Sequence, residues 1–316
     1  MTIHETETLK KPDIKFLDKL KGYIDLTRAH FAIVWPLLFC SGLMLAFRNY
    51  GGFDWWLLVR VALIGLFGFE AGMVLNDIID RKIDQIEPDD TMTKYWRPFK
   101  ERPIPSGIVS LKEAVTILII FLVITIALIA TLPFPNFLYV YGIMIYAYSA
   151  EYFYHTKKRN QKFPFAQLIG RTDLTVFPLA GYLSFGKPDL TILLFAVFFY
   201  PWALAHLGTN DIGDVENDQA KNLNTVTVLY GLDGNVIWIA LFTFLHIAAV
   251  PIFLIFGGFG LVAIICFSIA TVLLLIANIL LILKRTAKRG RKVLPMLHAS
   301  LFLYTTSIII DSALVF

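Results

Sequence analysis

Charged residues are scarce in this sequence. They make up 16% of its 316 residues, while hydrophobic residues make up 57%; soluble domains usually carry about 25% charged residues. This shortage argues against a soluble globular protein, and we expect no nucleic-acid partner. The composition instead predicts an all-α, polytopic protein of the cell membrane, whose apolar segments of roughly 20 residues each cross the lipid bilayer.

Cysteine is nearly absent as well. The two cysteines, Cys40 and Cys266, both fall inside apolar runs, where a thiol usually packs as a small hydrophobic group. A disulfide framework and a cysteine-based zinc site are therefore not expected. The first 29 residues are polar and lack a short apolar core followed by a small-residue cleavage site, so we expect no cleaved signal peptide and interpret 1–29 as a cytoplasmic N-terminal segment.

Long apolar runs, by contrast, are abundant after residue 29. Nine of them are long enough to span a bilayer, which predicts a single transmembrane domain over 30–316. An odd number of spans places the two termini on opposite sides of the membrane. The predicted spans are 30–48, 55–76, 111–132, 136–154, 165–185, 189–209, 234–256, 258–283 and 294–315.

The basic residues predict the orientation of these spans. With this set of spans, 24 of the 28 Lys and Arg residues lie before the first span or in the even-numbered loops, on one side of the membrane. By the positive-inside rule, the N-terminus and the long loops at 80–110 and 210–233 are cytoplasmic. Long ordered loops usually carry function.

Two acidic clusters end two of the apolar runs on this side. The first is Asn76-Asp77-Ile-Ile-Asp80-Arg81-Lys-Ile-Asp84, and the second is Asn210-Asp211-Ile-Gly-Asp214-Val-Glu-Asn-Asp218. Carboxylates this close to hydrocarbon are costly without cations. The clusters end the second and sixth spans, so two four-helix halves that face each other, with a ninth helix added, would bring them together.

The spacing within each cluster suits a divalent cation. Asn76, Asp80 and Asp84 stand at i, i+4 and i+8, which on a helix places three oxygen ligands on one face; Asp214 and Asp218 repeat the i, i+4 spacing, and Asp211 lies one turn earlier. Hard oxygen ligands suit Mg²⁺ shared with a phosphate-bearing molecule. The alternative for any single Asp is simple exposure to cytoplasmic water. Asp77 points off this row, which favours a structural role.

Other polar residues have candidate roles beside the metal ligands. Basic side chains on the same face are candidates to bind phosphate oxygens, although any of them could simply set the topology. Glu70 lies nearly two turns deeper than Asn76 and is a candidate base. Arg171 and Asp173 interrupt the fifth span; they either neutralise each other or face a substrate. The basic candidates are Arg28, Arg81, Arg102, Lys157 and Lys158.

These motifs resemble those of the UbiA-type intramembrane prenyltransferase family, and the resemblance covers nearly the whole chain. The family motif NDxxDxxxD matches Asn76, Asp77, Asp80 and Asp84, and its second motif, DxxxD, matches Asp214 and Asp218. The resemblance implies nine helices around a central cavity, Mg²⁺ held by both motifs, and contacts of Arg81 and of a Lys at 157 or 158 with diphosphate.

Two positions depart from the family pattern. Many members carry Tyr and Lys eight and four residues before the first Asp of the second motif, where this sequence has His206 and Asn210. Both residues, with Arg171 and Asp173, are therefore candidates for the acceptor side of the site.

The expected activity is Mg²⁺-dependent transfer of a prenyl group from a polyprenyl diphosphate to a hydrophobic acceptor, with release of diphosphate. Asp80, Asp84, Asp214, Asp218 and Glu70 are the predicted catalytic residues. The first expected acceptor is a phenolic precursor of a quinone-like electron carrier; the alternative is a glycerophosphate hydroxyl in archaeal-type ether lipid synthesis. A cation-coupled transporter is a further alternative, but it predicts acidic residues near mid-membrane.

Overall fold

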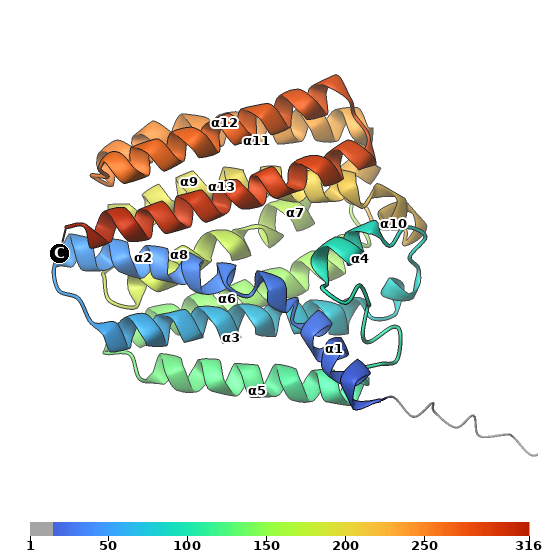
Figure 1. Cartoon of the computed structure of the whole chain (residues 1–316), viewed down its shortest axis with the longest axis horizontal. Coiled ribbons are helices and arrows are strands. Elements are labelled where there is room, and N and C mark those ends of the chain that lie inside the picture. Colours follow the sequence, from blue (N-terminus) through green and yellow to red (C-terminus); the bar gives the residue numbers. More distant parts are fainter. Residues whose placement is uncertain (1–14, 316) are drawn as a thin grey trace, which may run out of the picture.

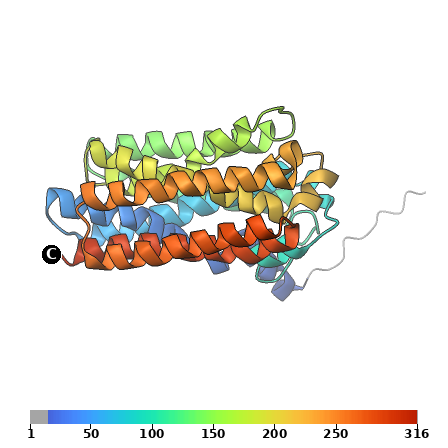
Figure 2. The ribbon, with the colours of Figure 1, turned by 90° about the horizontal axis from the view of Figure 1, so that it is seen from above.

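The computed structural model describes residues 15–315. Residues 1–14, with Lys10 and Lys11 of the predicted N-terminal segment, and Phe316 lie outside the described part. Figure 1 shows long helices lying side by side with their axes nearly parallel, and Figure 2 shows the same from above. The main helices are α1 (Phe16–Leu26), α2 (Val34–Tyr50), α3 (Trp55–Asp80), α4 (Thr91–Trp96), α5 (Leu111–Ala130), α6 (Asn136–Lys157), α7 (Phe165–Gly170), α8 (Thr172–Leu183), α9 (Leu190–Gly213), α10 (Val215–Ala220), α11 (Val226–Phe256), α12 (Leu261–Leu283) and α13 (Ala287–Ala313).

The all-helical prediction is confirmed, because the elements of residues 15–315 are all helical. Within this part of the chain, seven helical segments are long and apolar enough to cross a membrane. The other two predicted spans correspond to α6, which is rich in tyrosine, and to the pair α7 and α8, each shorter than a span. The chain is thus a multi-span membrane protein, and the count of nine crossings stays a prediction.

Breaks in the helices differ from the predicted continuous spans. The fifth span is divided into α7 and α8 at Arg171. Helix α11 contains Gly231 at φ +70°, a backbone conformation that favours glycine, so the predicted start at residue 234 follows this kink. Non-helical backbone at membrane depth is tolerated where it lies inside the protein or lines a cavity.

Two glycines allow α2 and α8 to touch at the backbone. A Cβ atom on Gly42 would lie 1.8 Å from the Pro178 carbonyl oxygen, and one on Gly181 would lie 1.8 Å from the Phe39 carbonyl oxygen. Small residues at such crossings let membrane helices pack closely without a hydrophobic driving force between them. The α2/α8 contact therefore requires glycine at both positions and fixes the centre of the bundle.

Side-chain hydrogen bonds to backbone amides fix the starts of two helices and one long loop. Ser110 and Glu113 form a capping box at the start of α5, and Asp54 accepts hydrogen bonds from two backbone amides at the start of α3. At the end of the bundle that contains α1, α4 and α10 (Figure 1), the Asp25 carboxylate accepts hydrogen bonds from the backbone amides of Phe99 and Glu101. These bonds hold the long 81–110 loop in place over the bundle.

Candidate active site

A cavity of about 490 Å³ lies within the bundle, and the 81–110 loop contributes part of its wall. Its lining combines six carboxylates with six basic side chains, alongside an apolar wall that includes Trp35, Phe69 and Trp202. The carboxylates are those of Asp80, Asp84, Glu151, Asp211, Asp214 and Asp218, and the basic side chains are those of Arg28, Arg97, Arg102, Lys158, Arg171 and Lys221. A cavity lined by both charged and apolar side chains suits a ligand that is itself polar at one end and apolar elsewhere.

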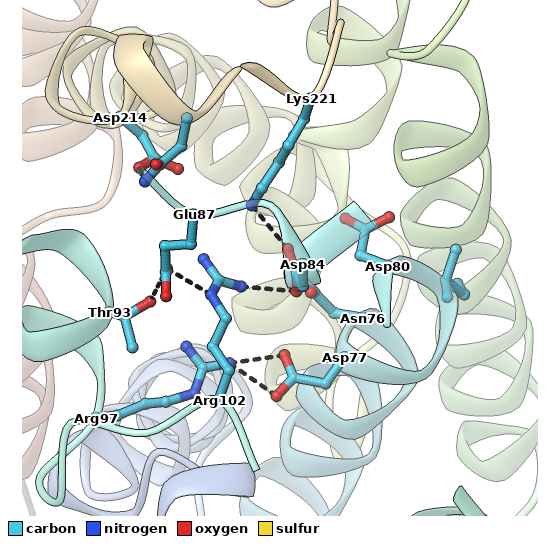
Figure 3. Close-up of polar contacts among 12 residues, drawn as sticks. Asn76, Asp77, Asp80, Asp84, Glu87, Thr93, Arg97, Arg102, Asp214 and Lys221 are labelled. Atoms are coloured by element: carbon cyan, nitrogen blue, oxygen red, sulfur yellow. Dashed lines mark hydrogen bonds and ion pairs between the residues drawn. The ribbon is translucent and has the colours of Figure 1, made fainter. Parts of the chain in front are cut away.

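The first acidic cluster reaches this cavity from two elements. Asn76 and Asp80 lie on the last turns of α3, which ends at Asp80, and Asp84 lies in a short 3₁₀ helix, Ile83–Gln85. The predicted helical row of three ligands is therefore wrong as local structure, because the helix stops before Asp84. All three side chains nevertheless line the cavity, since the chain turns back toward it after Asp80 (Figure 3).

Asp77 of the same cluster lies away from the cavity lining. Its buried carboxylate is 2.8 Å from the Arg28 guanidinium and 2.8 Å from the Arg97 guanidinium, and the second pair is drawn in Figure 3. Charges removed from water in this way need close partners of opposite sign. Asp77 therefore joins α3 to the 81–110 loop rather than facing a ligand.

The second cluster also spans a helix break. Asp211 lies on the last turn of α9, which ends at Gly213; Asp214 is the capping residue, and Asp218 follows on α10. The predicted i, i+4 spacing of Asp214 and Asp218 on one helix is therefore kept, since the Asp218 amide donates to the Asp214 carbonyl oxygen at 3.0 Å. The expected continuation of that helix back to Asp211 is wrong, because α9 ends at Gly213, although all three carboxylates line the cavity. Burial raises the pKa of Asp218 well above its ordinary value, and the neighbouring Asp214 and Asp211 carboxylates raise it further.

Basic side chains form ion pairs with two carboxylates of the first cluster, Asp80 and Asp84. Lys158 Nζ lies 2.8 Å from Asp80 Oδ2, and Lys221 Nζ lies 2.8 Å from Asp84 Oδ1. The Arg102 guanidinium contacts both Asp84 and Glu87 at 2.6 Å (Figure 3). Burial acts to lower the pKa of Arg102, but these two carboxylates outweigh it, so the pKa lies above its ordinary value.

The structure divides the predicted basic residues into two groups. Arg28, Arg102 and Lys158 line the cavity. Arg81 and Lys157 are outside its lining: the Arg81 guanidinium donates to the Ile78 carbonyl oxygen of its own helix end, and Lys157 is exposed. Their predicted direct contact with a ligand disagrees with this arrangement, because adjacency in sequence to Asp80 or Lys158 places a side chain on a different side of the helix.

Glu70 and Asp173 are outside the cavity lining too. The buried Glu70 accepts a hydrogen bond of 3.0 Å from Trp35 Nε1 and lies behind the stacked rings of Trp35 and Phe69. The predicted direct role of Glu70 as a base therefore disagrees with its place in the structure. The Asp173 carboxylate is 3.8 Å from the guanidinium of Arg171, which itself lines the cavity.

The remaining acceptor candidates, His206 and Asn210, both line the cavity. They lie one turn apart on α9. The His206 ring stacks on the indole of Trp202 and its Nε2 is 2.8 Å from His298 Nε2. The Asn210 side-chain oxygen accepts a hydrogen bond from Trp96 Nε1.

Five other charged or histidine side chains of the cavity were not predicted from the sequence as site residues. Glu151 and His155 lie one turn apart on α6 and hydrogen-bond to each other, and His155 Nδ1 lies 2.7 Å from Asp80. The other three are Arg97, Lys221 and His298. The i, i+4 spacing of Glu151 and His155 in an apolar helix was a usable signal, because polar residues in such helices normally face a cavity.

The donor set agrees in chemistry with Mg²⁺ but is spread over the cavity. Among residues 15–315, no three His, Cys, Asp or Glu side chains are clustered closely enough to hold a metal ion by themselves. The carboxylates of the two clusters instead come from two walls of one cavity and offer only oxygen ligands. Such a set fits a metal that is shared with a ligand rather than enclosed by protein alone.

The fold and the cavity together define a helical membrane protein with a carboxylate-lined internal site at one end of its bundle. The model of the UbiA prenyltransferase family matches residues 33–304. The chain therefore belongs to the UbiA prenyltransferase family, and it is an enzyme that transfers prenyl groups from diphosphate donors. The family membership therefore favours the prenyltransferase over the alternative of a cation-coupled transporter.

Individual relatives differ in the acceptor that their names imply. The chain is 28% identical over 281 residues, covering 85% of this chain and 89% of the relative, to digeranylgeranylglyceryl phosphate synthase of Methanococcus aeolicus. It is 26% identical to 4-hydroxybenzoate octaprenyltransferase of Vibrio atlanticus over 67% of this chain and 70% of the relative. A UbiA homologue from Archaeoglobus fulgidus, solved with GPP and Mg²⁺, shares the fold with a TM-score of 0.65 at 16% identity, over 92% of this chain and 99% of the homologue.

Proposed function

We propose that this protein transfers a prenyl group from a polyprenyl diphosphate to a hydroxyl-bearing hydrophobic acceptor in a Mg²⁺-dependent reaction. The observation that carries the proposal is the meeting of both acidic clusters with Lys158, Arg102 and Lys221 in one cavity that also has an apolar wall. The carboxylates would hold Mg²⁺, and the three basic side chains would bind the diphosphate oxygens. The homologue of the same fold that was solved with GPP and Mg²⁺ supports a prenyl diphosphate and Mg²⁺ as the ligands.

The chain's own residues would promote departure of the diphosphate. When bound, Mg²⁺ would offset the negative charge that the diphosphate gains as its bond to the allylic carbon breaks. Lys158 and Arg102 would add positive charge on the same side. The positive charge left on the prenyl carbon would face the aromatic rings of Trp35, Phe69 and Trp202, which attract cations through their π faces. The same wall would exclude water, which otherwise captures the prenyl group.

The cavity suits a phenolic acceptor first. Phe31, Trp96 and Trp202 line it beside the polar atoms of His206 and Asn210, a combination that suits an aromatic ring bearing a hydroxyl group. A glycerophosphate acceptor is the second candidate, and it is supported by the 28% identical relative named digeranylgeranylglyceryl phosphate synthase, which matches 85% of this chain. Both acceptors carry a hydroxyl group.

The orientation of the protein follows from the same proposal. The clusters, the 81–110 loop and α10 lie at one end of the bundle, and the C-terminal end of α13 lies at the other (Figure 1). The excess of basic residues in the loops of the first end supports a cytoplasmic position for the active site and for the N-terminus.

The proposal is tested by incubating purified protein with labelled geranylgeranyl diphosphate, Mg²⁺ and separate phenolic and glycerophosphate acceptors. We expect one acceptor class to give a prenylated product by mass spectrometry. Chelation of Mg²⁺ by EDTA should reduce the rate to background, because the carboxylates would then repel the diphosphate, and added Mg²⁺ should restore it. Product formation that persists in EDTA would contradict the metal-dependent reaction.

Adjacent lysines provide a matched test of diphosphate binding. We expect Lys158→Ala to weaken the binding of the prenyl diphosphate at least about 10-fold, since a charge-assisted hydrogen bond contributes about 1.5–3 kcal/mol. The Lys157→Ala variant should bind the donor as the wild type does, because Lys157 is exposed outside the cavity lining. Dissociation constants for a non-hydrolysable donor analogue provide the measurement. Equal effects of the two substitutions would refute the assignment of Lys158.

A further inference from the structure

Three side chains from three different helices form a hydrogen-bonded chain beside the cavity. His206 Nε2 on α9 lies 2.8 Å from His298 Nε2 on α13, and His298 Nδ1 lies 2.6 Å from the hydroxyl of Tyr95 on α4. Both histidines line the cavity. Tyr95 belongs to the 81–110 loop and is only half-buried. These three hydrogen-bonded side chains therefore lead from the cavity toward the aqueous end of the bundle.

Because neutral imidazole has one donor and one acceptor nitrogen, the hydrogen bonds among His206, His298 and Tyr95 can run in either of two directions. Each neutral ring has one N–H donor and one acceptor nitrogen. If His206 donates from Nε2 to His298, then His298 donates from Nδ1 to the Tyr95 hydroxyl, and His206 Nδ1 carries a lone pair. If the direction is reversed, His206 Nδ1 carries a proton. The two directions thus convert His206 Nδ1 from a proton acceptor to a proton donor.

His206 Nδ1 is the one ring nitrogen of the two histidines that has no hydrogen-bond partner among residues 15–315, and this atom is buried. Buried polar atoms without a partner are uncommon in folded proteins, and a bound molecule or an ordered water is the usual explanation. The ring itself lines the cavity and is held in place by stacking on Trp202, at 5.1 Å between ring centroids.

We propose that the His206–His298–Tyr95 chain accepts the proton of the acceptor hydroxyl during prenyl transfer and conducts it toward the cytoplasmic end. This inference rests on the proposed function and deepens it. The bond between the allylic carbon and the diphosphate oxygen breaks, and its electron pair leaves with diphosphate. The acceptor oxygen forms the new bond to carbon, and its proton moves to His206 Nδ1. The proton of His206 Nε2 then passes to His298, and the His298 Nδ1 proton passes to Tyr95, which releases its own proton to water.

For an acceptor that is alkylated at a ring carbon, the new bond joins two carbons and the hydroxyl proton again moves to His206 Nδ1, which leaves a carbonyl oxygen on the ring. The proton on the alkylated ring carbon then passes by way of water to that oxygen, so the phenol is regenerated and one proton in total is released. In both cases His206 is the group that touches the acceptor, and His298 and Tyr95 act through it. Arg171 from the α7/α8 break and Asp211 from α9 line the same cavity.

The test compares His206→Gln and His298→Gln with the wild type in prenyl transfer to whichever acceptor class the wild type uses. Glutamine keeps hydrogen-bonding capacity but does not accept a proton. We expect kcat to fall about 100-fold or more for His206→Gln, the scale of general base catalysis, and less for His298→Gln. The dissociation constant of the donor diphosphate analogue should not change, which also shows that the variants are folded. Added imidazole should restore part of the kcat of His206→Ala.

A second buried His–Tyr pair in the same bundle provides the control. His246 Nε2 on α11 is 2.9 Å from the Tyr304 hydroxyl on α13, and His246 Nδ1 is 2.8 Å from the Phe198 carbonyl oxygen; neither residue lines the cavity. His246→Gln is expected to leave kcat within about threefold of the wild type. An equal loss in His246→Gln, or a wild-type kcat in His206→Gln, would overturn the proton path. A wild-type protein that prenylates no acceptor would overturn the proposed function itself.

Discussion

Replacing Asp80 or Asp214 by alanine should reduce prenyl transfer about 1,000-fold or more. Each substitution removes an oxygen ligand from one of the two cavity walls that we propose to hold Mg²⁺, and electrostatic stabilisation of a developing charge by one group is already worth about 10²–10³ in rate. Asp80 has a second task, because its carboxylate contacts Lys158, Arg159 and His155. Its loss would release these basic groups from their position.

The measurement is the initial rate of prenylated product at saturating donor, with the Mg²⁺ concentration varied. Asp233→Ala provides the control, because the Asp233 carboxylate is 76% exposed and pairs only with an exposed Arg285 among the ion pairs of residues 15–315. That variant should keep the wild-type rate. Retained Mg²⁺-dependent transfer in both Asp80→Ala and Asp214→Ala would contradict the proposed roles of the two clusters.

Replacing Asp77 by alanine is expected to have its main effect on stability. The substitution leaves Arg97, which is 3% exposed, without its buried carboxylate partner, and Arg28 loses the same partner. Breaking a buried ion pair on one side costs about 3–5 kcal/mol. The thermal unfolding midpoint in detergent should therefore fall strongly, and the 81–110 loop should become easier to cleave with protease.

An exposed ion pair provides the comparison for Asp77. Asp90→Ala removes a pair with Lys94 in which both side chains are about half exposed, and such pairs contribute about 0–1 kcal/mol. Equal unfolding midpoints for the Asp77 and Asp90 variants would show that the buried ion pairs stabilise the fold no more than the exposed pair does. A further variant, Asp77→Leu combined with Arg97→Met, should recover part of the stability because it removes both charges of one pair.

Much of the helical fold was predictable, because apolar runs of bilayer length leave the backbone few alternatives to a helix. The polar breaks were not. The end of α3 at Asp80 and the end of α9 at Gly213 both fall inside the acidic clusters, where the i, i+4 spacing suggested continuous helices. The spacing of the acidic residues is the same whether a helix continues or ends within the cluster. Packing of the following loop against the bundle decides where the helix ends.

Some site residues could likewise be placed from helix spacing alone, whereas others depend on how the helices pack against one another. Asn76 and Asp80 have fixed positions on α3, and the sequence suffices to place them on one face. Lys157 and Lys158 are neighbours in a basic run, and only the packing of α6 against α3 directs Lys158 to Asp80. Glu70 lies behind Trp35 for a similar reason, since the rotation of α3 relative to α2 is set by side-chain contacts that one sequence does not reveal.

The ion pair between Asp84 and Lys221 joins positions 137 residues apart. The hydrogen bonds between Asp89 and Asn217 span 128 residues beside it. Loops that are closed by such distant partners form only after the later segment has been made. During synthesis, the helices from α2 to α8 therefore enter the membrane before the polar end of the cavity is complete. A ribosome-bound chain that stops before α10 would have its acidic first motif in place but no assembled active site, so a newly made chain gains activity only when its C-terminal half has been inserted.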